Sequence, residues 1–190
     1  MLGVFRTDDV TRWSHMNMLR SLASSPEHSS DADQIHQINK LAFEGPAEAD
    51  LVDRLRESCP GFVSLVARSD GRAVGHIAFS PVVLRSSDRQ HPGMGLAPMS
   101  VVPDLQRQGI GSQLVQAGLD ELRKRGVQFV VVLGHPDYYP RFGFTPSAPL
   151  GIKCEFGDVP AEAFMVLPLD QDMSLESGLI QYHSEFDVFK

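Results

Sequence analysis

The pattern that most constrains this chain is a strand, a glycine-containing loop, a helix and a second strand in succession. An apolar run at 96–102 is followed by the loop 106–111, whose sequence is Gln-Arg-Gln-Gly-Ile-Gly. Apolar residues then recur at helical spacing over 110–125. The continuous apolar run at 128–133 is typical of a strand buried on both faces beside a parallel neighbour. These segments predict a βαβ unit, whose right-handed crossover places the loop at the carboxyl end of the first strand, where open α/β sheets bind ligands.

The glycine loop has the composition of a phosphate cradle. Gly109 and Gly111 let successive backbone N–H groups turn toward one point, and the helix that begins there adds the positive end of its dipole. A P-loop would require a lysine after the second glycine, where this chain has Ser112. A Rossmann fingerprint would require a third glycine and an acidic residue at the end of the next strand, which is Leu-Gly-His at 133–135. The loop therefore predicts either another kind of phosphate site or an ordinary turn into a helix.

Hydrophobic periodicity and turn residues predict the remaining elements. Helices are expected over 31–43 and from Pro46 to just before Pro60, and Asp70 with Gly71 predicts a tight hairpin turn. The stretch 85–95 is rich in turn residues and is expected to be a loop. Besides the two strands of the βαβ unit, runs with strand character occur at 18–22, 62–68, 72–84 and 163–169, with a terminal run at 179–183.

Composition and charge exclude several classes of protein. The chain has no apolar run of the roughly 18–20 residues that cross a bilayer, and acidic residues at 8–9 interrupt the region where a signal peptide would have its apolar core. A cytoplasmic location without membrane association is therefore expected. The formal net charge of −7 argues against nucleic acid as a partner. Cys59 and Cys154 form no disulfide or zinc motif. A single domain over 17–190 is expected, preceded by a loosely ordered extension over 1–16.

Two motifs in this chain resemble those of the GNAT superfamily of N-acetyltransferases. Residues 106–111 match the motif [QR]-x-x-G-x-[GA] at every fixed position, and 99–105 resembles the strand, proline and loop that precede it in the family. The segment 135–144 is similar to the family's second motif, aromatic-Tyr-x-[KR]-x-G-Phe. The resemblance covers residues 17–183 and is strongest to a bacterial subgroup of predicted acetyltransferases. It implies an α/β (mixed α+β) GNAT-like fold, with a central twisted, mostly antiparallel sheet, one parallel βαβ unit at the coenzyme A site, and flanking helices.

The resemblance also implies acetyl-CoA as co-substrate and indicates which segments bind it. A bulge in strand 96–102 would free backbone groups, so that the N–H of Val101 bonds the acetyl oxygen, and the N–H groups of 107–112 would hold the pyrophosphate. Many family members have an asparagine upstream of the motif tyrosine that binds coenzyme A, where this chain has Val132. The residues expected to bind the cofactor are Met99, Ser100, Val101, Arg107, Gln108, Gly109, Ile110, Gly111 and Ser112.

The expected chemistry is the attack of an amine on a thioester, which requires a polarised carbonyl, a base for the amine and a proton for the departing thiolate. By resemblance, Tyr139 is the general acid toward the thiolate, and Tyr138 belongs to the core or to the wall of the substrate site. Two tyrosines packed over the sheet are the structural alternative. Glu44 is the first choice for the base, with Glu48, His76 or a chain of waters as alternatives. The seven histidines show no metal-ligand spacing, and no metal is expected.

The resulting hypothesis is an enzyme that transfers the acetyl group of acetyl-CoA to a primary amine of a small molecule or a peptide. The alternative is an acyl-CoA-binding regulatory module without turnover, because the usual asparagine is absent and no base is firmly assigned. The negative net charge mildly favours a cationic amine through steering. A homodimer is compatible with the sequence, although no segment specifies an interface.

Overall fold

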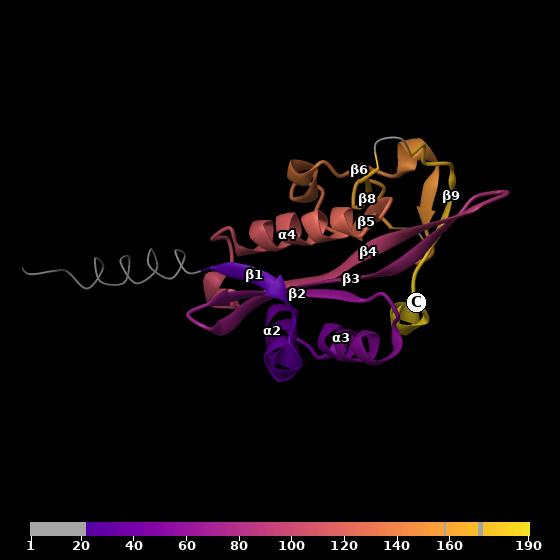
Figure 1. Cartoon of the computed structure of the whole chain (residues 1–190). Helices are drawn as coiled ribbons and strands as arrows, with labels where there is room; N and C mark the ends of the chain where they lie inside the picture. Colours follow the sequence, from indigo (N-terminus) through magenta and orange to yellow (C-terminus); the bar gives the residue numbers. More distant parts are fainter. Residues whose placement is uncertain (1–21, 158, 171–172) are drawn as a thin grey trace, which may run out of the picture.

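The computed structural model of the chain describes residues 22–157, 159–170 and 173–190. The described strands join in one mixed sheet (Figure 1). The expected extension over 1–16 lies outside the described residues, as does the expected strand at 18–22 except for its last residue. The first described strand instead spans Ala23–Pro26.

In the described part of the chain, three α-helices cover the two faces of the sheet. Figure 1 shows α4 (Ile110–Lys124) on one face, and α2 (Ala32–Ala42) and α3 (Ala47–Ser58) on the other. Their buried positions follow the helical period, so the three predicted helices are confirmed to within a residue or two at each end. The short 3-10 helices are η1 (Ser29–Asp31), η2 (Pro103–Leu105), η3 (Tyr139–Phe142), η4 (Ala148–Leu150) and η5 (Ser184–Phe189).

The sheet is mostly antiparallel. Its main path runs in the order β1-β2-β3-β4-β5-β8-β6, and β9 pairs with β3 and with β7. The pair β4–β5 is parallel, as the βαβ unit predicts, and the short pair β7–β9 is a second parallel pair that the sequence did not indicate. The strands are β1 (Ala23–Pro26), β2 (Val63–Ser69), β3 (Arg72–Arg85), β4 (Gln90–Val101), β5 (Phe129–Leu133), β6 (Thr145–Pro146), β7 (Ile152–Cys154), β8 (Phe164–Pro168) and β9 (Gly178–Gln181).

The hairpin between β2 and β3 has the predicted turn. Asp70 and Gly71 both have positive φ, at 50° and 77°, as a primed two-residue turn requires. The expected loop over 85–95 is wrong, because β3 continues to Arg85 and β4 already begins at Gln90.

Glycines in the early part of β4 serve packing, although they resemble turn residues in the sequence. A Cβ on Gly93 would lie 2.4 Å from Cζ of Phe129, and a Cβ on Gly95 would lie 2.9 Å from Cε1 of Tyr182. Both glycines therefore let large rings pack against the strand. Within the described residues, no helix is long and apolar enough to cross a membrane.

Candidate active site

Strands β4 and β5 separate at the carboxyl end of β5, and a large cavity opens there. The two strands are paired from Met94 to Leu96 on β4, whereas β4 continues to Val101. The cavity has a volume of about 1060 Å³. It is lined by the end of β4, the glycine loop, the segment after β5, the junction of α2 and α3, and aromatic residues from the C-terminal part of the chain. This is the edge at which the βαβ pattern predicts a ligand.

A bulge in β4 lies at the point where β4 and β5 separate. Ile77 of β3 faces Met99, but Phe79 faces Leu96, so Ala78 is opposite two residues of β4 instead of one. Such a bulge re-aims the backbone beyond it. The bulge expected from the resemblance in strand 96–102 is therefore present.

The backbone groups of Met99 and Val101 point away from β3 and toward the cavity side of β4. The N–H of Val102 donates to the carbonyl of Val74 at 3.0 Å. Val102 and Val74 are therefore a hydrogen-bonded pair of the antiparallel ladder. Hydrogen-bonded and non-hydrogen-bonded pairs alternate along an antiparallel ladder. The N–H and C=O groups of Val101 and Met99 therefore face away from β3. The side chain of Gln106 supports this orientation, because its Nε2 donates to the outward carbonyl of Val101 at 3.1 Å.

The glycine loop presents unpaired amides at the start of α4. Arg107 and Gly109 have positive φ, at 60° and 88°. The first amide of the helix to bond within it is that of Gln113, which donates to the carbonyl of Gly109 at 3.0 Å. The preceding amides have no partner in the helix, and neither a capping side chain nor an acidic residue lies in the first turn of α4. This positive helix end fits a pyrophosphate.

The expected cofactor-binding residues differ in how they meet the cavity. Met99, Ser100, Val101, Arg107, Gly109, Gly111 and Ser112 line it. Gln108 and Ile110 do not, because the side chain of Gln108 bonds the carbonyl of Asp104 at 3.2 Å and that of Ile110 is in the core. These two residues can contribute backbone only, which is the contribution that the resemblance implies. Val132 is buried in the core and does not line the cavity.

Gly111 leaves space at the helix end that a side chain would fill. A Cβ at this position would lie 2.9 Å from the hydroxyl oxygen of Tyr138 and 3.4 Å from Cε of Met99. The backbone of α4 is therefore open to the cavity at a point enclosed by two lining side chains. This narrow approach fits a cofactor that is held by backbone groups.

Tyr139 is fixed in orientation by its surroundings. Its ring meets those of Tyr138 and Phe144 edge to face, at centroid distances of 5.1 and 5.7 Å. A Cβ on Gly134 would lie 2.3 Å from Cε2 of Tyr139, so this ring lies directly on the backbone. Burial, and to a smaller extent the neighbouring Tyr138, raises the pKa of Tyr139 above its ordinary value, and the phenol is protonated at neutral pH.

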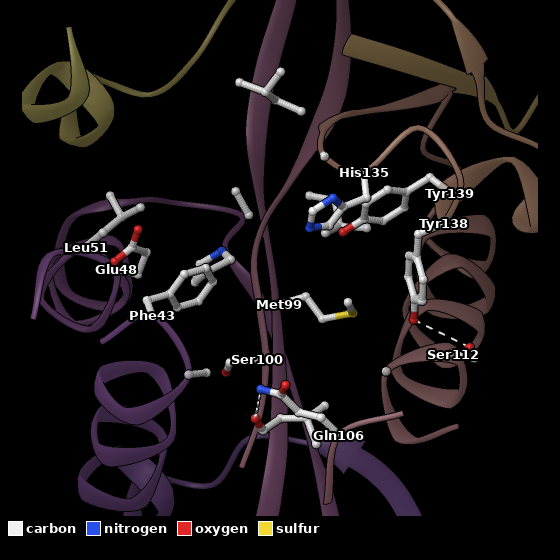
Figure 2. A pocket seen from close by; sticks show the side chains of 18 of the residues that line it. Phe43, Glu48, Leu51, Met99, Ser100, Gln106, Ser112, His135, Tyr138 and Tyr139 are labelled. Carbon is white, nitrogen blue, oxygen red and sulfur yellow. Dashed lines mark hydrogen bonds between the residues drawn. The ribbon is translucent and has the colours of Figure 1, made fainter. Parts of the chain in front are cut away.

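Tyr138 lies over the start of α4. Its hydroxyl is 3.4 Å from Oγ of Ser112, and the guanidinium of Arg141 is 4.6 Å from its ring centroid. Figure 2 shows the two tyrosine rings pointing in different directions, Tyr138 toward Ser112 and Tyr139 toward the middle of the cavity. Of the two hydroxyls, that of Tyr139 is therefore the one directed into the middle of the cavity.

The three side chains considered for the base lie in different environments. Glu44 is exposed, has a positive φ of 56°, and is outside the lining of the cavity. Glu48, in the first turn of α3, is half-buried and lines the cavity. Figure 2 shows Glu48 and Phe43 on one side of Met99, and the tyrosines on the other.

His76 is a structural residue. It is fully buried between Asn39, whose Nδ2 donates to its Nδ1 at 3.1 Å, and the hydroxyl of Ser64, 3.0 Å from its Nε2. Burial, followed by the charge of Arg56, lowers the pKa of His76 to about 3, so the imidazole is neutral. It does not line the cavity.

Sequence reasoning missed the far side of the cavity. Besides Phe43 and Leu51, this side contains four aromatic side chains that come from distant parts of the chain: Phe156, Tyr182, Phe186 and Phe189. No local motif marks them, because only the fold brings η5 beside α3 and packs Phe156 and Tyr182 against the same cluster. His135 and Arg141, both inside the second motif, also line the cavity. Among the described residues, no three His, Cys, Asp or Glu side chains are grouped so that they could hold a metal ion.

Comparison with known proteins decides the family. A sequence model of the acetyltransferase (GNAT) domain matches residues 25–147. The chain belongs to the GNAT family of acetyltransferases. It is 40% identical over 163 residues to a protein of Escherichia coli K12 named uncharacterized N-acetyltransferase YhbS. The aligned region covers 84% of this chain and 95% of that protein.

Solved structures agree with this family. The crystal structure of YhbS from E. coli in complex with CoA has a TM-score of 0.80 at 37% identity, covering 88% of this chain and 92% of that one. The crystal structure of a GNAT acetyltransferase from Brucella melitensis in complex with acetyl-CoA has a TM-score of 0.71 at 35% identity. The match covers 87% of this chain and 98% of that one. The predicted GNAT fold is confirmed, and the chain is an acetyl-CoA-dependent acyltransferase by membership of this family.

Proposed function

We propose that this protein transfers the acetyl group of acetyl-CoA to the primary amine of a small molecule or a peptide in the cavity between β4 and β5. The observation that carries this proposal is the convergence of four features on one cavity. These are the unpaired amides at the start of α4, the outward backbone of Met99 and Val101, the ring of Tyr139, and the carboxylate of Glu48. Two structural relatives were solved with CoA or acetyl-CoA bound, which supports the donor.

The donor occupies the α4 side of the cavity. The amides of 107–112 hold the pyrophosphate, because the helix dipole and the absence of an acidic residue in the first turn favour an anion there. The pantetheine runs along the outward backbone of Met99 and Val101. The N–H of Val101 donates to the acetyl oxygen and stabilises the negative charge that develops on it.

The amine is activated from the opposite side. Glu48 accepts a proton from the incoming ammonium, directly or through a water, and the free amine attacks the carbonyl carbon of the thioester. The carbon–sulfur bond then breaks, and the Tyr139 hydroxyl donates a proton to the departing sulfur. The nitrogen carries an extra proton after the attack and returns it through water to the tyrosinate, while Glu48 releases its own proton to solvent. The products are the acetylated amine, free CoA and one proton. We assign the base to Glu48 instead of Glu44, because Glu48 alone of the two lines the cavity.

The test is the release of free thiol from acetyl-CoA with a panel of amines and peptides. We expect amine-dependent release by the wild type, and a loss of about 100-fold or more in kcat in Glu48→Gln, since general base catalysis typically contributes that much. Glu44→Gln is the matched control, four residues away and exposed, and should keep the wild-type rate.

Two other outcomes would contradict acetyl transfer or the choice of Glu48 as the base. If acetyl-CoA binds but no amine accelerates thiol release, the protein is the acyl-CoA-binding module without turnover. If Glu44→Gln is inactive and Glu48→Gln is not, the base assignment is reversed. A cytoplasmic location and a homodimer stay predictions.

A further inference from the structure

The far side of the cavity is built largely from aromatic rings. Phe156, Tyr182, Phe186 and Phe189, here called the aromatic wall, all line the cavity. Ring centroids are 4.9 Å apart for Phe156 and Tyr182, 5.2 Å for Tyr182 and Phe186, and 6.5 Å for Phe186 and Phe189. The four rings therefore form a connected surface instead of isolated contacts.

The aromatic wall reaches the reacting part of the cavity. Phe186 packs in one cluster with Leu51 of α3, and Ala97 at the bulge of β4 packs against the same cluster. Ala97 is two residues from Met99, whose backbone faces the cavity. A ligand that contacts the wall therefore also lies close to the outward edge of β4.

Charge is divided between the two sides of the cavity. Glu48 is the only acidic side chain among the described lining residues, and it lies beside Leu51 and Phe43 on the acceptor side. The cations Arg107 and Arg141 belong to the glycine loop and to the segment beneath Tyr138, on the α4 side. The acceptor side thus offers one carboxylate and a large apolar surface.

We propose that the acceptor is a small primary amine that carries an aromatic ring, such as an arylalkylamine. Its ammonium group pairs with Glu48 and its ring packs on the aromatic wall. This inference rests on the proposed acetyl transfer and names its substrate class. A polyamine would leave its further ammonium groups without a carboxylate, and a peptide would leave backbone groups unpaired against the rings.

The position of the wall in the sequence supports a role in choosing the acceptor. Its four residues lie beyond the residues 25–147 that match the general GNAT domain. The residues of the α4 side, by contrast, fall within that range. The aromatic wall therefore lies outside the matched GNAT domain, whereas the α4 side of the cavity lies inside it.

The experiment compares four acceptors with the full chain: 2-phenylethylamine, n-butylamine, spermidine and a short peptide with a free amino terminus. The rate of thiol release from acetyl-CoA gives kcat/KM for each. We expect 2-phenylethylamine to exceed n-butylamine by about 10–100-fold, which corresponds to the burial of a ring of this size. Spermidine and the peptide should be poorer still.

Two pairs of variants tie this preference to the cavity. Phe189→Ala and Phe43→Ala remove lining rings that are 41% and 40% exposed, so neither should disturb folding. Val188→Ala and Leu41→Ala are their matched controls, at 64% and 56% exposure and outside the lining. The preference for the aromatic amine should fall about 5-fold or more in each lining variant and should be unchanged in the controls.

The outcomes separate this inference from the proposed function. If spermidine or the peptide is acetylated faster than 2-phenylethylamine, the substrate class is wrong, whereas acetyl transfer stands. An aromatic preference that survives both lining variants would also overturn the role of the rings. If acetyl-CoA binds and none of the amines releases thiol, acetyl transfer itself is contradicted.

Discussion

At the scale of single residues, the proposed mechanism assigns roles to two groups that lie on opposite sides of Met99. Tyr139 is fixed by two rings and by the backbone at Gly134. Glu48 lies in the first turn of α3 and lines the cavity. The motif position of Tyr139 could be recognised in the sequence, because aromatic spacing is local. The choice between Glu44 and Glu48 could not, since the two lie four residues apart and only the bend between α2 and α3 decides which one faces the cavity.

The role of Tyr139 can be tested by removing its hydroxyl. We expect Tyr139→Phe to lower kcat by about 100-fold or more with little change in the KM for acetyl-CoA, since the ring and its packing remain. Burial raises the pKa of Tyr139 above 10, so the wild-type kcat should not decline through this group below about pH 10. Steady-state kinetics over a pH series would measure both effects. An unchanged kcat in Tyr139→Phe would remove Tyr139 from the mechanism.

His76 gives the fold a dependence on pH. Its pKa is about 3 in the folded protein and near 6.5 when unfolded, so the unfolded chain binds a proton that the folded one does not. Stability is therefore complete above pH 6.5 and is lost as the pH falls toward 3. Between pH 7 and pH 5 this group should cost about 2 kcal/mol of the free energy of unfolding.

Urea denaturation at the two pH values measures this loss. His76→Gln keeps a polar side chain between Asn39 and Ser64 but cannot titrate, so the difference between pH 7 and pH 5 should be smaller in the variant. An equal loss in both proteins would mean that His76 does not control it.

At the scale of elements, local period and long-range packing account for different parts of the fold. The helical repeat located α2, α3 and α4, and the Asp70–Gly71 pair located the β2–β3 turn. The early part of β4 was missed, because the role of Gly93 and Gly95 depends on Phe129 and Tyr182, which are distant in sequence. For the same reason the aromatic wall has no sequence signature of its own.

Gly118 allows α4 to pack closely on the sheet, and replacing it tests how much this close packing contributes to stability. A Cβ there would lie 2.4 Å from Cε2 of the buried Phe79. Alanine favours a helix over glycine by about 1 kcal/mol, whereas overpacking a core costs about 1–3 kcal/mol. We expect the second effect to win, so that Gly118→Ala lowers the free energy of unfolding in urea. A more stable variant would show that α4 can move away from β3 at little cost.

At the scale of the whole molecule, the sheet brings three distant parts of the chain to one cavity. The α2–α3 junction contributes Glu48, the βαβ unit contributes the outward edge of β4 and the start of α4, and the C-terminal part contributes the aromatic wall. The chain carries a net charge of −7, yet the start of α4 has no acidic residue in its first turn. The proposed anion site therefore depends on one helix end and not on the net charge of the chain.

The most direct test of a pyrophosphate site at the start of α4 is a calorimetric titration of the wild type and Ser112→Glu with acetyl-CoA. A glutamate in the first turn should preserve or stabilise α4 through the helix dipole, but its charge opposes a pyrophosphate at the same place. Gln113→Glu, exposed and outside the cavity lining, is the matched control. We expect one acetyl-CoA bound per chain in the wild type and in Gln113→Glu, and at least about tenfold weaker binding, or 1.4 kcal/mol, in a fully folded Ser112→Glu. No binding by the wild type, or equal affinity in all three proteins, would contradict a pyrophosphate site at this helix end.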